Sequence, residues 1–243
     1  LALYAVPAGL LMRFQTLPAV FATVSIPMFT EAGQAGDREA LARLYLKSSR
    51  ALLWAALPCL VLLFALMPQF LSLWLGPRFG MESVWPARIL VLAYAVGLLS
   101  FQPSALAQAL GKPGWSSALG WAQALVGVAA WAWLVPERRI LGAAWGSFAA
   151  QAVPVPVFMW FVHKRLLGLG WARCVSEAAL APVATAAGLL ALVMPIHAWA
   201  ATWPRLVGVV AAGLALYGAA NWLLMSGADR DYFRKVLRLE RGA

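Results

Sequence analysis

The chain has 243 residues, of which 63% are hydrophobic and 12% charged, and its mean hydropathy is +0.78. Soluble domains are about 45–50% apolar and about 25% charged, so this composition excludes a soluble globular fold. The apolar runs are long and lack the alternation of membrane strands, which predicts an all-α integral membrane protein. We interpret the net charge of +10 as a signal of topology, and we expect the lipid bilayer, not a nucleic acid, as a partner.

The first predicted span, residues 3–29, contains one permanent charge, Arg13. A helix that enters near Tyr4 would place Arg13 on the order of 13 Å deep, where an arginine costs about 2.5–3.5 kcal/mol. Arg13 shares a helical strip less than about 90° wide with small and polar residues, namely Gly9, Thr16, Thr23 and Pro27. Arg13 therefore lines a solvated cavity for an anion, or bonds the carbonyls of a neighbouring helix, or snorkels to the surface.

If Arg13 lines a cavity, Arg13 and Thr16 are candidates for binding a phosphate or pyrophosphate, which a guanidinium binds bidentately. All nine carboxylates lie outside the predicted membrane centres. Coupled exporters of cationic drugs commonly use a buried acid. The charge distribution therefore favours an anionic substrate.

Residues 31–50 predict an amphipathic interfacial helix that leads into the second span. Asp37 is a candidate N-cap, and Glu39 can pair with Arg43 one turn later.

Six further spans are predicted, and a breaker follows each of them: 51–75, 86–110, 115–135, 140–162, 178–196 and 204–225. Gly142 and Gly146 have the GxxxG spacing of a tight helix contact. The seven spans together make one transmembrane domain, residues 1–225. A basic amphipathic tail follows at 229–241, and we expect it to lie on the inner leaflet.

Lys and Arg are divided unequally between alternate loops, thirteen against five. By the positive-inside rule the richer set, which includes the C-terminal tail, is cytoplasmic. The chain opens within a hydrophobic segment and without a charged leader, so we expect it to be the later part of a longer protein.

Gln102 and Gln108, in the third span, are further candidates for the substrate cavity. They lie about 120° apart around a helix, so both can face one cavity only if Pro103 bends that helix. A helix–helix hydrogen bond is the alternative for both, and for the other membrane amides, which are Gln15, Gln123, Gln151 and Asn221.

No pattern predicts a catalytic group, a metal site or a cofactor, so we expect no enzyme activity. Cys59 and Cys174 have no CxxC spacing and are expected to be inert. His163 and His197 fall at the ends of predicted spans, where an interfacial position is expected.

Several stretches resemble one family in order and spacing. Residues 26–50 (IPMFTEAGQAGDREALARLYLKSSR) resemble the segment after the eighth helix of the Wzx-type polysaccharide (O-antigen) flippases. Residues 68–79 (PQFLSLWLGPRF) are similar to that family's exit from the ninth helix. Residues 109–113 (ALGKP) and 140–146 (ILGAAWG) resemble its "alGk" turn and a later helix entry. These flippases share the MOP superfamily with the MATE drug exporters and the lipid II flippase.

The resemblance implies the C-terminal lobe of a MATE-like transporter of twelve to fourteen helices. Such a protein would flip a polyprenyl-pyrophosphate-linked oligosaccharide across the bacterial cytoplasmic membrane for O-antigen, lipopolysaccharide or other surface polysaccharide biosynthesis. The polysaccharide polymerase and export machinery would be its partners. Arg13 corresponds to a cavity arginine in the eighth helix of the related lipid II flippase. A cation-coupled MATE-type exporter of drugs or metabolites and a non-transporting membrane assembly subunit are the alternatives.

Overall fold

The computed structural model describes residues 2–224 and 227, and its regular structure is helical throughout that part of the chain. The predicted all-α class is therefore confirmed for the described residues. The helices are α1 (Ala2–Phe14), α2 (Thr16–Gln34), α3 (Arg38–Leu75), α4 (Pro77–Leu98), α5 (Phe101–Ala109), α6 (Pro113–Ala152), α7 (Pro154–Val162), α8 (Trp171–Cys174), α9 (Leu180–Ile196) and α10 (Trp203–Leu224). Two π-helical turns, η1 (His163–Leu167) and η2 (Val175–Ala179), and a 3-10 turn, η3 (His197–Trp199), join the later helices.

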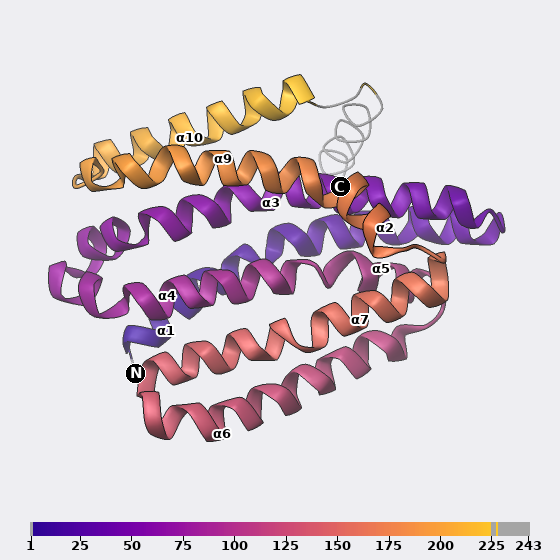
Figure 1. The fold of residues 1–243 in the computed structure, drawn as a ribbon, viewed down its shortest axis with the longest axis horizontal. Helices are drawn as coiled ribbons and strands as arrows, with labels where there is room; N and C mark the ends of the chain where they lie inside the picture. Colours follow the sequence, from indigo (N-terminus) through magenta and orange to yellow (C-terminus); the bar gives the residue numbers. More distant parts are fainter. Residues whose placement is uncertain (1, 225–226, 228–243) are drawn as a thin grey trace.

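Six helical stretches within the described residues are long and apolar enough to cross a membrane: Val6–Gln34, Arg38–Leu75, Glu82–Ala109, Pro113–Leu167, Trp171–Trp199 and Trp203–Leu223. They confirm the multi-pass membrane character. The helices run back and forth along one long axis, and the turns that connect them gather at the two ends of the bundle (Figure 1).

The longest of these stretches folds back on itself. It has 55 residues, which as one straight helix would measure about 80 Å, against a hydrocarbon core of about 30 Å. Arg139 breaks the helix with φ 50° and ψ −120°, and the chain reverses there (Figure 1). Across the reversal, Trp131 Nε1 donates a hydrogen bond to the Ala143 carbonyl at 3.0 Å. The reversal therefore divides this stretch into two arms that pack side by side.

Two glycines allow the arms to approach closely. Gly142 lies against the Leu134 carbonyl, and Gly146 lies against the Trp131 ring, so closely that a Cβ on either glycine would overlap its neighbour. The tight helix contact predicted from the GxxxG spacing is present: Gly142 and Gly146, on the second arm, pack against the first arm.

Replacing Gly146 with leucine should destabilise the protein by about 1–3 kcal/mol or more, because the new side chain would push the two arms apart. The control is Gly120→Leu, since Gly120 lies on the same helix with open space around its Cα. Thermal unfolding in detergent measures the difference. Equal melting temperatures for the two variants would contradict this account of the hairpin.

The central element of the bundle is α3. The side chain of Asp37 accepts a hydrogen bond from the Ala40 amide at 2.9 Å, which confirms the predicted N-cap. The helix then continues without a break to Leu75, so residues 38–50 of the predicted interfacial segment form one helix with the second span, whereas residues 31–34 end α2. Apolar side chains of α3 belong to all three clusters of buried residues. It shares the first cluster with α4, the second with α5 and α7, and the third with α9 and α10.

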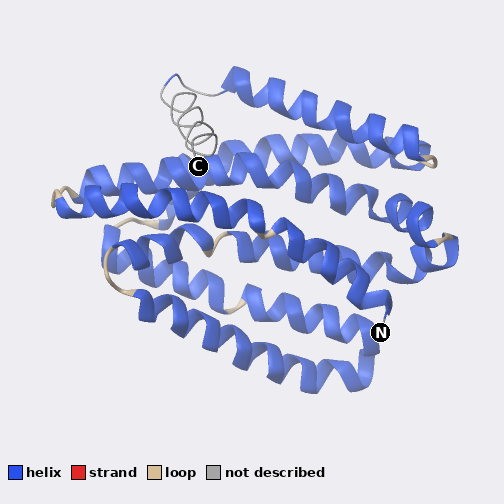
Figure 2. Cartoon of the chain, turned by 180° about the vertical axis from the view of Figure 1, so that it is seen from behind, coloured by secondary structure: helices blue, strands red, loops and turns tan. Residues whose placement is uncertain are grey.

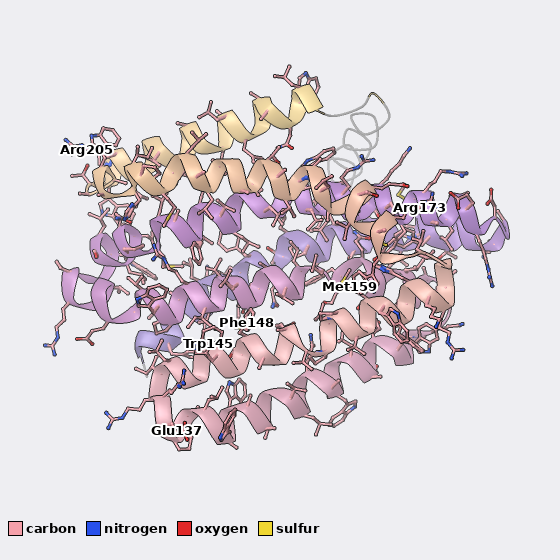
Figure 3. All side chains as sticks on the ribbon, viewed as in Figure 1. Glu137, Trp145, Phe148, Met159, Arg173 and Arg205 are labelled. Atoms are coloured by element: carbon pink, nitrogen blue, oxygen red, sulfur yellow. The ribbon has the colours of Figure 1, made fainter. Side chains whose placement is uncertain are left out.

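Exposed ion pairs tie the start of α3 to the later helices. Arg173 donates to both carboxylate oxygens of Glu39, and its Nε donates to Glu177 at 2.8 Å. The predicted pair of Glu39 with Arg43 is also present, at 3.6 Å. Arg173 and Arg205 lie at opposite ends of the bundle (Figure 3).

The last predicted span, 204–225, coincides with α10 as far as Leu224. The predicted tail at 229–241 lies outside the described residues.

Candidate functional site

Three membrane helices are interrupted part-way along their length. The breaks fall at Gln15 between α1 and α2, at Leu99 and Ser100 between α4 and α5, and at Val153 between α6 and α7. Figure 2 shows such breaks as short tan segments within blue helices.

A proline follows each break within a few residues. Pro18, Pro103 and Pro154 have no N–H, so each leaves the carbonyl four residues earlier without its helical partner. At the first break, Thr16 Oγ1 donates to the Arg13 carbonyl at 2.8 Å. At the second, Ser100 Oγ donates to the Gly97 carbonyl at 2.7 Å. The hydroxyls of Thr16 and Ser100 thus donate hydrogen bonds to backbone carbonyl oxygens next to two of the breaks.

Residues next to all three breaks line one cavity of about 300 Å³. We call it the amide cavity. Its wall carries seven neutral polar side chains, from α1, α4 and α6 and from the first two breaks: Tyr4, Gln15, Tyr94, Ser100, Gln123, Ser147 and Gln151. Phe14, Phe101 and leucines complete the lining. No residue in this lining carries a carboxylate or a basic group.

The hairpin in α6 brings two of the amides together. Gln123 Nε2, on the first arm, donates to Gln151 Oε1, on the second arm, at 2.8 Å. Gly97 on α4 faces this pair, and a Cβ there would lie 3.0 Å from Gln151 Oε1. The pair is therefore fixed in position by close packing against α4.

A second set of hydrogen bonds fixes the wall near α1. Ser147 Oγ donates to the Ala143 carbonyl at 3.0 Å. Because a serine hydroxyl has one hydrogen, the 2.8 Å contact between Tyr4 and Ser147 has the tyrosine hydroxyl as its donor.

Two other polar groups of the cavity are free to bind. Neither the Gln15 amide nor the Tyr94 hydroxyl bonds to another described residue. Gln15, which the sequence analysis expected to bond a neighbouring helix or a substrate, is exposed beside the cavity. Free amide and hydroxyl groups next to aromatic rings suit a neutral, hydroxyl-rich ligand.

Arg13 and Thr16 lie outside this cavity. Both side chains are exposed, as are the other members of their strip, Gly9, Thr23 and Pro27. Arg13 makes no ion pair or side-chain hydrogen bond with the rest of the described chain. Its neighbours Phe14 and Gln15 line the cavity, so the polar face of α1 and α2 adjoins the cavity at the first break.

Gln102 and Gln108 do not face one common cavity. Gln102 is only 2% exposed and accepts a hydrogen bond from Ser48 Oγ at 3.2 Å. It lines a second, smaller cavity, whereas Gln108 is exposed near the end of α5. The break at Ser100 precedes both residues, so the helix between them is continuous.

Gln123, Gln151 and Ser147 were not predicted from the sequence as site residues. Gln123 and Gln151 lie on successive predicted spans, and nothing local shows that they face each other. For Gln151 the signal that could have found it is the nearby mid-span Pro154, because a freed carbonyl is tolerated in a membrane only against protein or water. No proline lies beside Gln123 or Ser147 in the sequence.

Comparison with protein-family models, with curated proteins and with solved structures found no match.

Proposed function

We propose that this chain is a transmembrane lobe of a flippase that moves a polyprenyl-pyrophosphate-linked oligosaccharide across the bacterial cytoplasmic membrane. In this proposal the saccharide is destined for surface polysaccharide, and the C-terminus is cytoplasmic. The observation that carries the proposal is the position of Arg13 on an uncovered, polar face of α1 and α2.

The other outward faces of the bundle are very different. α6, α9 and α10 expose large apolar side chains suited to lipid, among them Trp121, Trp133, Leu192, Leu216 and Leu223. A guanidinium that faced lipid tails in the same way would be costly, because it cannot lose its proton. We infer that the Arg13 face borders a watery chamber between this lobe and a second lobe, as in a MATE-like transporter.

The reversal at Arg139 supports a count of seven crossings. If each arm of that 55-residue stretch spans the membrane once, the six stretches make seven crossings. An odd number places the two ends of the lobe on opposite sides, which agrees with the unequal division of basic residues between alternate loops.

The two polar regions suit the two parts of such a substrate. Arg13 would bind the pyrophosphate by charge-assisted hydrogen bonds. The amide cavity beside it offers neutral donors and acceptors to sugar hydroxyls, while the polyprenyl tail stays in the bilayer.

A flipping assay in liposomes tests the proposal. The protein is reconstituted with a fluorescent polyprenyl-pyrophosphate disaccharide, and a membrane-impermeant reagent then reports how much of it reaches the other leaflet. We expect flipping of this lipid and none of the matched polyprenol disaccharide that lacks phosphates. A drug exporter would instead move cationic drugs, and an assembly subunit would move none of these compounds; either result would overturn the proposal.

A further inference from the structure

Three exposed cations gather at the open end of the hairpin formed by α6 and α7, the end away from the reversal at Arg139. Lys112 comes directly before α6, and Lys164 and Arg165 lie in η1, directly after α7. The start of α6 and the end of α7 lie side by side at one end of the bundle (Figure 1). Cations that are far apart in the chain therefore share one surface, and we call them the basic cluster.

Two aromatic rings that touch each other carry two of these cations. Lys112 Nζ lies 4.8 Å from the centre of the Trp115 ring, and Arg165 Cζ lies 5.8 Å from the centre of the Phe161 ring. The centres of these two rings are 4.5 Å apart. A ring face attracts a cation, so the pair of rings holds Lys112 and Arg165 together and joins the start of α6 to the end of α7.

The backbone that carries the basic cluster is anchored in the bundle. The Lys112 amide donates to the Ala107 carbonyl at 2.8 Å. His163, which was predicted to lie at an interface, is instead only 3% exposed, and its Nε2 lies 2.7 Å from Tyr45 Oη. Because His163 fixes the start of η1 from inside the protein, the two cations that follow it project from a fixed position.

No acidic side chain within the described residues neutralises the basic cluster. None of its three cations forms an ion pair or a side-chain hydrogen bond with that part of the chain. Arg173, a few residues further on, is by contrast bonded to both Glu39 and Glu177. A cation that lies over a ring keeps N–H donors for other partners. The basic cluster therefore has charge and donors available to an anion from outside the chain.

The N-terminus of α6 favours the same kind of partner. No side chain caps this end, and its first residue, Pro113, has no N–H. Gly114 has open space where a side chain would lie, so a ligand can approach the backbone there. The first amides of a helix and its dipole attract an anion. Backbone and side chains at this surface thus select the same charge.

An apolar stripe leads along α7 to the basic cluster. Val153, Val157 and Trp160 recur at helical spacing, and they are 56%, 62% and 47% exposed. Lys164 continues this face, with Nζ 5.1 Å from the centre of the Trp160 ring. An apolar stripe that ends in cations matches a lipid with acyl chains in the bilayer and an anionic headgroup at its surface. A free phosphate would leave the stripe unused.

We propose that the basic cluster binds the headgroup of an anionic phospholipid, whose acyl chains lie along the exposed face of α7. A phosphate is held between Lys112 and Arg165, beside the N-terminus of α6, and Lys164 binds the headgroup from the face of the stripe. Since three cations contribute, a lipid with two phosphates, such as cardiolipin, binds more tightly than phosphatidylglycerol. The bound lipid joins α6 to α7 at the open end of their hairpin. This site is independent of the proposed flippase cargo.

The first measurement titrates the purified protein in detergent with cardiolipin, phosphatidylglycerol or phosphatidylcholine and counts bound lipids by native mass spectrometry. We expect cardiolipin to bind most tightly and phosphatidylcholine least. In the triple variant Lys112→Gln, Lys164→Gln, Arg165→Gln, cardiolipin should bind about 100-fold more weakly, because each cation near an anionic headgroup contributes about fivefold in affinity. The variant Lys112→Arg, Lys164→Arg keeps the charges and should bind as the wild type does.

The matched control is Arg205→Gln. Arg205 is also an exposed cation, with Cζ 5.2 Å from the centre of the Trp199 ring, and it lies at the end of the bundle opposite Arg173 (Figure 3). Its removal should leave cardiolipin binding unchanged. Equal affinity of the triple variant and the wild type would overturn the proposal, and so would an equal loss in Arg205→Gln, since binding would then follow net charge alone.

The second measurement needs no variant and therefore does not depend on how a variant folds. A ligand that binds the native state raises the melting temperature. We expect cardiolipin to raise it by several degrees relative to phosphatidylcholine, and salt to reduce this difference, because exposed charges are screened. Inorganic phosphate should not reproduce the rise. Equal melting temperatures in the two lipids would overturn the proposal, and a rise with inorganic phosphate alone would show an anion site without a lipid.

Discussion

The Arg13→Ala variant is expected to lose flipping of the pyrophosphate-linked saccharide by about 100-fold, while the protein still inserts in the membrane. A charge-assisted hydrogen bond contributes about 1.5–3 kcal/mol, and a loss of about 3 kcal/mol corresponds to roughly 100-fold in affinity. Insertion should not suffer, because the Arg13 side chain has no partner within the described chain and its removal takes an unpaired charge out of the membrane. The Arg13→Lys variant keeps the charge without the bidentate fork, so we expect an intermediate loss of about tenfold.

The matched control is Arg78→Ala. Arg78 is also exposed and, within the described part of the chain, pairs with Glu82 alone, at 3.2 Å across one turn of α4, so its removal should leave flipping unchanged. Membrane amount and melting temperature are measured beside the flipping rate. Full activity of Arg13→Ala would exclude a phosphate-binding role, and a loss of stability in step with activity would favour a structural role for the arginine.

The double variant Gln123→Leu, Gln151→Leu is expected to keep the stability of the protein and to lose most of its flipping. Each single variant leaves one part-buried amide without its partner, at a cost of up to about 1–3 kcal/mol, whereas replacing both partners by apolar groups of similar size is nearly neutral. The double variant should therefore melt near the wild-type temperature, above either single variant. Its cavity would lack the amide pair that we assign to sugar hydroxyls.

A similar polar pair elsewhere in the bundle provides the control. Thr185 Oγ1 donates to Asn221 Oδ1 at 3.2 Å between α9 and α10, away from the amide cavity. The double variant Thr185→Val, Asn221→Leu should keep both stability and flipping. If the variant at Gln123 and Gln151 flips at the wild-type rate, the amide cavity does not bind the saccharide.

The sequence alone predicted the all-α class of the protein, its long apolar helices and some local features of those helices. Asp37 caps α3 as expected, and within the expected turn at 109–113 Gly111 has φ +71°, two residues before α6 begins at Pro113. The strip that contains Arg13 and Thr16 also lies on one face, and all its members are exposed. These features depend on residues within one or two turns of each other, where helical geometry and side-chain chemistry are decisive.

Only the tertiary structure decided which polar residues share a cavity. Gln15, Ser100 and Gln151 are far apart in the chain, yet the three breaks bring them together. Gln102, a predicted cavity residue, instead lies beside His163 in a different cavity. Which cavity a membrane amide lines depends on which helices pack against its own helix and on where those helices are broken. That information resides in long-range contacts such as those of Gly142 and Gly146 with the preceding arm, and not in the hydrophobicity of any single span.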